Sequence, residues 1–261
     1  MRRLLQCEYQ KSRGRWIFFT ALALTVTAAV SALYGVCKGE NRQFILENGY
    51  LMLLYQLPMV NTIFFPVLGM VVASRLCDLE HKGDTLKLLC TLTEKGRLFD
   101  AKLLYGLGIT LFCVCLYWAA CLMAGVLLGF AGPVPWKPEL LYLLFTLAPT
   151  AVIYVFQHSL SLLVKNQAVA LCAGALGEFA GLFSMFLPQL PWMRRSLLWG
   201  YYGELQFVGL FDWDKDTRWT KAHFEMMGFD WRSFILLCLM GLGLYLLGRR
   251  SFIRKEMKNV M

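Results

Sequence analysis

The sequence is poor in charged residues and in the groups that many enzymes use for catalysis. Only 16% of its 261 residues are charged, whereas a soluble domain usually carries about 25%. The three histidines, His81, His158 and His223, are too scattered to form the His-Glu-x-x-His helix of a zinc enzyme. No Gly-x-x-x-x-Gly-Lys-Ser/Thr or Gly-x-Ser-x-Gly motif occurs, which excludes phosphate loops and nucleophile elbows of those types. These absences argue against a soluble protein and against an enzyme.

The sequence also predicts neither a metal ion nor a cofactor. Asp212, Asp214 and Asp216 begin like a calcium-binding loop, but Thr217 takes the place of the required glycine and His223 that of the required glutamate. The nine cysteines do not have the arrangement of a disulfide framework and are expected to act as small buried apolar residues.

Apolar residues make up 58% of the chain and occur in long runs. A run of roughly 20 apolar residues can cross the ~30 Å hydrocarbon core of a bilayer as a helix. Six such runs lie at residues 16–36, 50–74, 103–129, 140–164, 167–187 and 231–248. The predicted fold class is therefore all-α, a polytopic membrane protein with six transmembrane helices in one domain. The net charge is +9, and the basic residues that give it lie between these runs. This position favours lipid headgroups over nucleic acid as a partner.

The basic residues predict the orientation of the chain. Six spans put both termini on one side of the membrane. Of the 26 Lys and Arg residues, 17 fall in segments 1–15, 75–102, 165–166 and 249–261, while the opposite segments hold nine basic and nine acidic residues. Because cytoplasmic segments carry the excess of Lys and Arg, both termini are predicted to be cytoplasmic. The first run is longer than the usual 7–15-residue core of a signal peptide, so we expect it to remain in the chain.

The inner segment 75–102 is predicted to contain a helix with an apolar stripe. Asp84 can cap this helix. The stripe consists of Leu86, Leu89 and Thr93, with Leu88 and Leu92 beside them. Such a helix either lies on the lipid surface or docks on a cytoplasmic protein. Its polar face is mixed in sign, which favours the protein partner.

Glu178 is the only acidic residue inside any of the six runs. An acid near mid-membrane costs about 2.5–3.5 kcal/mol on insertion, so it normally faces protein or water. Gly174, Gly177 and Gly181 surround it, and the last two have the spacing of close helix packing. Two interpretations remain open: a structural glutamate at a helix interface, or a gate or pathway residue at the centre of a dimer.

The outer connection 188–232 is rich in aromatic residues. It holds five of the eight tryptophans, at positions 192, 199, 213, 219 and 231. Trp and Tyr prefer the headgroup boundary of a bilayer. The segment is therefore predicted to form short interfacial or re-entrant helices in the outer leaflet.

The whole pattern resembles the type-2 ABC exporter permeases. The shared features are six spans, a short amphipathic N-terminal helix over residues 1–15, an inner loop that contains Glu80, and a broken outer segment after the fifth span. The loop resembles the coupling segment of that family through Glu80, Gly83, Leu88-Leu89 and Ala101-Lys102.

Three stretches resemble the lantibiotic-immunity permeases within that superfamily. They are Cys7-Glu8-Tyr-Gln-Lys11, the segment from Gln157 through Lys165-Asn166 to Gly177, and the exit Pro188…Pro191. The sequence departs from the family in having Cys7 at a small-residue position and in its Trp-rich outer loop. These departures leave the substrate-handling face undefined.

The resemblance implies a permease of the bacterial cell membrane that does not hydrolyse ATP itself. Its partners would be two ATP-binding cassette ATPase subunits and a second permease, identical or paralogous. The ATPase-coupling residues would be Glu8, Glu80, Lys82, Gly83, Asp84, Leu88 and Leu89. The dimer-interface or pathway residues would be Gly174, Gly177, Glu178 and Gly181. The substrate would be a lantibiotic or a similar membrane-active peptide, expelled from the outer leaflet.

Two alternatives remain at this stage. The exported substrate could be a bacitracin-like peptide, a lipid or a drug. The chain could also be a membrane scaffold or assembly protein without transport activity. None of these functions requires a cofactor.

Overall fold

The computed structural model describes residues 1–37, 42–83, 85–187, 189–213 and 222–258. Within these residues, six helices are long and apolar enough to cross a membrane. They are α2 (Ile17–Cys37), α3 (Arg42–Lys82), α5 (Lys95–Leu128), α6 (Trp136–Leu163), α7 (Gln167–Met185) and α10 (Trp231–Lys258). The predicted all-α membrane protein with six spans is confirmed.

Several of these helices are longer than the apolar runs that predict them. Helix α3 has 41 residues, which extend ~60 Å at 1.5 Å per residue, about twice the thickness of the hydrocarbon core. Hydropathy marks only the part of a helix that lipid surrounds, whereas backbone hydrogen bonding continues into water. The predicted span limits at residues 50, 103 and 248 therefore lie inside their helices, and where the membrane ends along each helix stays a prediction.

Glu178 is the only acidic residue inside the six predicted apolar runs, but the longer helices contain further acidic residues outside those runs. Glu80, Asp100 and Glu139 lie in the membrane-spanning helices α3, α5 and α6 as the structure has them. Each lies near a helix end, where the sequence is less apolar than in the middle of the run.

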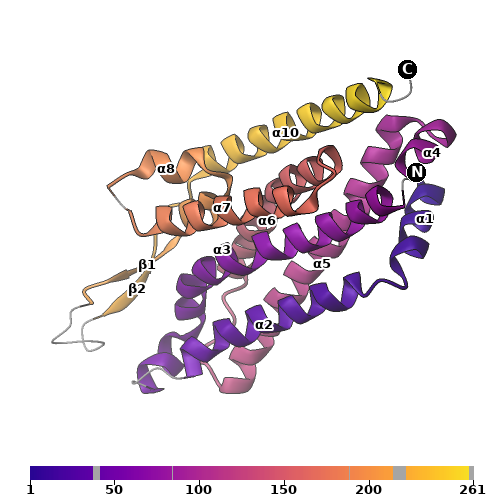
Figure 1. Ribbon diagram of the computed structural model, residues 1–261. Coiled ribbons are helices and arrows are strands. Elements are labelled where there is room, and N and C mark those ends of the chain that lie inside the picture. Colours follow the sequence, from indigo (N-terminus) through magenta and orange to yellow (C-terminus); the bar gives the residue numbers. More distant parts are fainter. Residues whose placement is uncertain (38–41, 84, 188, 214–221, 259–261) are drawn as a thin grey trace.

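Helix α3 occupies the middle of the bundle (Figure 1). It packs against α2, α5, α6 and α7, while α10 packs mainly on α6. The peripheral helices keep apolar side chains on their outer faces, among them Phe112 and Met123 of α5 and Leu239 and Leu242 of α10. In a bilayer these faces contact acyl chains, which is why the chain carries so few charges.

The two ends of the bundle differ in structure. Both termini, the N-terminal helix α1 (Arg2–Ser12) and the short helix α4 (Thr85–Leu92) lie at one end, which we call the α4 end (Figure 1). A two-stranded hairpin lies at the opposite end, which we call the hairpin end. This arrangement agrees with six spans and two termini on one side. That the α4 end faces the cytoplasm stays a prediction from the distribution of Lys and Arg.

The outer connection contains strands as well as the expected short helices. After α7 the chain forms α8 (Pro191–Ser196), the 3-10 turn η1 (Leu198–Gly200) and α9 (Tyr201–Glu204). Strand β1 (Val208–Phe211) then pairs antiparallel with β2 (His223–Met226), with Val208 opposite Met226. The prediction of helices alone is wrong here, because the apolar and aromatic residues of Val208–Phe211 favour an extended strand.

Trp199 departs from the predicted interfacial belt. Trp192, Trp213 and Trp231 are exposed, but Trp199 is only 7% exposed. Its ring meets Phe156 of α6 edge-on, with ring centroids 5.4 Å apart. Trp199 is therefore a packing residue between helices, while Trp219 lies outside the described residues.

Gly106 of α5 marks a close approach to α3 and α6. A Cβ atom at this position would collide with the Tyr154 hydroxyl of α6 and would lie 2.7 Å from Leu76 Cδ1 of α3. Tyr154 and Leu76 are fully buried and have no free space to move into. We expect Gly106→Ala to lower the free energy of unfolding by about 1–3 kcal/mol, because overpacking strains the core. Unfolding of the detergent-solubilised protein by SDS, followed by tryptophan fluorescence, measures the change.

Gly108, half a turn further along α5, provides the control. A Cβ atom there would have no neighbour within 4 Å. Gly108→Ala is expected to keep or slightly raise stability, because alanine is the better helix former. Equal effects of the two substitutions would contradict the packing assigned to Gly106.

Candidate functional site

Four charged side chains from three helices meet at the α4 end. Lys102 of α5 donates hydrogen bonds to Glu8 Oε2 of α1 at 2.7 Å and to Glu80 Oε1 of α3 at 3.3 Å. Lys11 of α1 donates to Glu80 Oε1 at 2.8 Å and to Glu8 Oε1 at 3.3 Å. We call these four residues the charge cluster. Its two carboxylates and two ammonium groups balance.

Three members of the charge cluster are buried. Glu8 and Glu80 are 2% exposed and Lys102 is 1% exposed. A buried charge without a partner costs several kcal/mol, so each member depends on the others. The charge cluster therefore fixes α1 against α3 and α5.

Further hydrogen bonds extend the charge cluster to α4 and to the helix backbone. Thr85, the first residue of α4, donates to Glu80 Oε2 at 2.5 Å. Lys102 also donates to the carbonyl oxygen of Leu76 at 3.2 Å. Nearby, the hydroxyls of Ser12 and Tyr105 lie 2.5 Å apart and join α1 to α5. The start of α4 is thus attached to the same group of residues that holds α1.

Lys11 is the most accessible member of the charge cluster. Partial burial by itself disfavours its charged form, but the hydrogen bond to Glu80 and the charges of Glu8 and Glu80 outweigh that effect. The net result is a pKa raised above the usual value for lysine. Lys11 therefore stays protonated at any physiological pH and keeps both carboxylates paired.

Helix α4 presents an apolar edge beside this charged interior. Leu86 and Cys90 face the protein and are buried, whereas Leu88 is 59% and Leu92 is 72% exposed. Leu88 and Leu92 are four residues apart and so lie on the same side of the helix. We call these two side chains the α4 edge. An exposed apolar edge next to charged residues is typical of a protein interaction site.

The structure distributes the predicted coupling residues over two environments. Leu88, Lys82 and Gly83 are exposed, and Leu89 is half-buried. Lys82 pairs with Asp78 at 2.7 Å on the surface.

Glu8 and Glu80 are buried within the chain, so their carboxylates do not offer a surface to a partner. Lys11 and Lys102 already pair with their oxygens within the chain. A role of Glu8 and Glu80 in coupling to an ATPase stays a prediction. Asp84 lies outside the described residues.

Lys11 and Lys102 are the site residues that sequence reasoning misses. Both occur in the stretches that carry the family resemblance, but nothing in the sequence pairs them with Glu8 and Glu80. The available signal is that Lys102 stands directly before an apolar run and Glu80 follows another, so that opposite charges lie near the same membrane boundary. That signal places these charged residues at the same membrane boundary, but it does not show which of them pair.

The glycines around Glu178 pack against their own chain. A Cβ atom at Gly177 or Gly181 would collide with Trp199, and one at Gly174 would collide with Met70 of α3. A second copy of the chain cannot reach these glycines unless those side chains move. Their proposed place at a dimer interface therefore finds no support in these contacts.

Glu178 is half-buried on the glycine-lined side of α7. The opposite side of the helix exposes Leu176, Phe179 and Phe183, which are suited to lipid or to an apolar partner. Glu178 thus lies on the side of α7 that packs against its own bundle. Its role in a substrate pathway stays a prediction.

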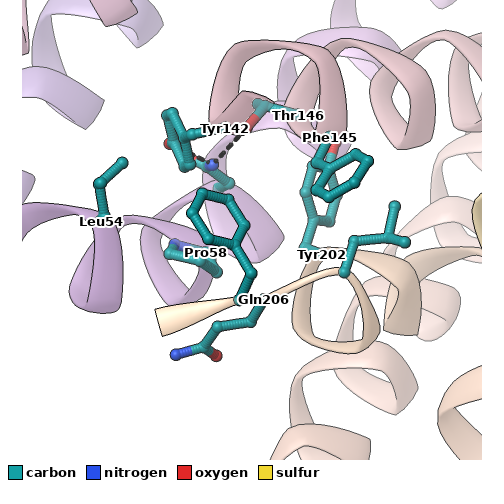
Figure 2. Close-up of a pocket in the computed structure, with 10 residues that line it drawn as sticks. Leu54, Pro58, Tyr142, Phe145, Thr146, Tyr202 and Gln206 are labelled. Carbon is teal, nitrogen blue, oxygen red and sulfur yellow. Dashed lines mark hydrogen bonds between the residues drawn. The ribbon is translucent and has the colours of Figure 1, made fainter. Parts of the chain in front are cut away.

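A small polar cavity lies between α3, α6 and α9 (Figure 2). Asn61 of α3 donates from Nδ2 to the Tyr142 hydroxyl at 2.6 Å and to Thr146 Oγ1 at 3.3 Å. The cavity has a volume of about 10 Å³, which is the size of about one water molecule. Pockets for drug-sized ligands measure about 300–1,000 Å³, so this cavity cannot hold an exported peptide.

Metal binding finds no support in the described part of the chain. No three His, Cys, Asp or Glu side chains converge there as metal ligands. Asp214 and Asp216 of the calcium-like sequence lie outside the described residues.

Removing Lys102 tests the charge cluster. We expect Lys102→Met to lower the free energy of unfolding by about 3–5 kcal/mol, because two buried carboxylates then share the single charge of Lys11. The double variant Lys102→Met/Glu8→Gln removes one charge of each sign and is expected to recover more than 1 kcal/mol of that loss. SDS unfolding of the detergent-solubilised variants measures both effects.

Lys82→Met is the matched control for this experiment. Lys82 also pairs with a carboxylate, but on the surface, where an ion pair contributes about 0–1 kcal/mol. If Lys102→Met were no more destabilising than Lys82→Met, the charge cluster would not hold α1, α3 and α5 together.

Comparison with known proteins places these features in a family. The family described as "ABC-2 family transporter protein" matches residues 4–181, more than half of the chain. The match includes the charge cluster, α4, the first four spanning helices and most of α7. No curated protein matches the chain. The chain therefore belongs to the ABC-2 family of transporter proteins and is a multi-pass membrane component, the permease, of an ABC transporter.

Proposed function

We propose that this permease belongs to an exporter whose separate ATPase docks on the α4 edge. The observation that carries this proposal is the exposure of Leu88 and Leu92 on a helix that the charge cluster holds in place. ATP-driven motion of the docked ATPase would move α4. The chain itself contributes no nucleotide-binding motif.

The position of α4 supports a protein partner over lipid. Helix α3 runs eight residues past its apolar run, from position 75 to Lys82, before α4 begins. At 1.5 Å per residue this extension is ~12 Å, enough to carry α4 out of the hydrocarbon core. The surrounding exposed residues Lys82, Glu94 and Arg97 are charged, so the α4 edge meets water unless a protein covers it.

The charge cluster gives a route for motion from α4 into the membrane. Thr85 joins α4 to Glu80 on α3, and Glu80 in turn joins α1 and α5 through Lys11 and Lys102. Because α3 is continuous over 41 residues, a tilt at the α4 end displaces its other end near the hairpin. Coupled transport requires such an element with two arrangements whose balance nucleotide shifts.

A second permease, identical or paralogous, would complete the transport pathway. The polar cavity between α3, α6 and α9 is too small for a peptide, so that cavity is not the pathway. The substrate we propose is a lantibiotic or a similar membrane-active peptide. Support for that substrate comes only from the sequence resemblance of three stretches, Cys7–Lys11, Gln157–Gly177 and Pro188–Pro191.

Charged substitutions on the α4 edge test the docking site. We expect Leu88→Asp/Leu92→Asp to abolish copurification of the ATPase subunit with the tagged permease, because burying two carboxylates in an apolar contact is unfavourable. Leu88→Met/Leu92→Met keeps an apolar edge and is expected to copurify normally. Both double variants should express as monodisperse protein, since the two side chains are exposed. Normal copurification of the Asp variant would overturn the docking site.

Glu178→Gln tests the pathway and the substrate together. The substitution keeps the shape of the side chain and removes its charge. If Glu178 lies on the pathway, cells with this variant should lose at least about tenfold in resistance to the lantibiotic, while ATPase copurification is unchanged. Growth inhibition by the lantibiotic, by bacitracin and by a hydrophobic drug provides the measurement. Full resistance in Glu178→Gln cells would show that Glu178 is a structural residue. If the unchanged permease protected cells against only bacitracin or only the hydrophobic drug, the substrate would not be a lantibiotic.

A further inference from the structure

A groove of about 580 Å³ opens between α1, α2 and α5 at the α4 end. Its walls are Leu5 and Tyr9 of α1 and Phe18 of α2, and its floor is formed by Leu104, Gly108 and Phe112 of α5. Phe18 and Phe112, which both line the groove, approach each other with ring centroids 6.2 Å apart. The surface of this open groove is almost wholly apolar.

The rim of the groove is positively charged. Arg2 lines it directly, and the exposed residues Arg3, Arg13 and Arg15 lie at the two ends of α1. Glu8 is the only acidic residue among the first 37 residues, and its carboxylate points into the charge cluster. No acidic residue of this part of the chain therefore offsets the charge of Arg2 at the rim.

The groove lies at the boundary between headgroups and acyl chains. Helix α2, the first span, begins at Ile17, directly after the exposed Trp16. An exposed tryptophan at the start of a spanning helix marks the membrane interface, because its ring is apolar and its N–H group is polar. The basic residues of α1 come before this point and the apolar floor on α5 continues toward the membrane interior.

We propose that this groove is a binding site for one anionic phospholipid. The phosphate group would pair with Arg2 at the rim, and one acyl chain would lie along α5 over Gly108 and between Phe18 and Tyr9. The charge of the rim selects an anionic headgroup over a zwitterionic one, and the apolar floor requires an acyl chain. The site goes beyond the proposed export function. It shares helix α1 with the charge cluster, but it uses none of the residues proposed for ATPase coupling or for the transport pathway.

Gly108 is the residue that allows a direct test. A Cβ atom there would have no neighbour within 4 Å, so a larger side chain would extend into the groove without disturbing the core. Gly108→Phe fills the floor, whereas Gly108→Ala leaves the groove open and serves as the matched control. Arg2→Gln removes the charge at the rim and keeps the apolar floor.

The experiment measures retained lipid by native mass spectrometry of the full chain in detergent. Dioleoyl phosphatidylglycerol and dioleoyl phosphatidylcholine are titrated separately, and glycerol phosphate is added as a competitor. The wild-type protein and Gly108→Ala should each retain one phosphatidylglycerol in preference to phosphatidylcholine. Gly108→Phe should weaken that binding by about tenfold, because several methylenes lose their contact with α5. Arg2→Gln should reduce the preference between the two lipids by about fivefold.

Each contrary result rejects the proposal in a distinct way. Wild-type binding by Gly108→Phe would show that lipid is held elsewhere. An unchanged lipid preference in Arg2→Gln would remove the role of the rim. Displacement of phosphatidylglycerol by glycerol phosphate would indicate a site for a free anion. Retention of a second copy of the chain in place of lipid, lost in Gly108→Phe, would identify the groove as a contact between permeases.

Discussion

The pairing of Lys102 with Glu8 and Glu80 is the interaction on which the α4 end depends. An ammonium group and two carboxylates are almost completely removed from water, at distances of 2.7 and 3.3 Å. In such surroundings the charges are held together less by net attraction than by the high cost of separating them. Lys11 neutralises the second carboxylate. The charge cluster therefore holds the N-terminal helix α1 against the spanning helices α3 and α5 in one favourable arrangement.

The charge cluster also holds helix α4 in place. Helix α4 is short and would be marginal by itself, since isolated helices of fewer than about 12 residues are unstable in water. Its first residue, Thr85, is bonded to Glu80, and its inner side chains Leu86 and Cys90 are buried. The α4 edge therefore belongs to a helix that its contacts with the rest of the protein hold in place. The long α3 connects that helix to the far side of the membrane.

Helix α1 serves two surfaces at once. Its inner side contributes Glu8 and Lys11 to the charge cluster, while Leu5 and Tyr9 form a wall of the apolar groove. A molecule seated in the groove would contact the same helix that positions the charge cluster and, through Glu80, α4. Lipid composition and ATPase docking would then be thermodynamically linked, because any ligand that prefers one position of α1 shifts the balance between positions.

The sequence by itself determined the membrane class, the six spans and a basic side with both termini. These follow because a lipid environment admits only long apolar helices and because charge asymmetry follows membrane sidedness. The sequence did not determine the helix ends, because backbone hydrogen bonds continue beyond the apolar runs. It did not determine the hairpin either. Only the tertiary structure decided that residues 8, 11, 80 and 102 meet, that Trp199 covers Gly177 and Gly181, and that α1 leaves a groove over Gly108. Contacts between residues so far apart in the chain depend on how helices pack, and one sequence carries no local signal for that packing.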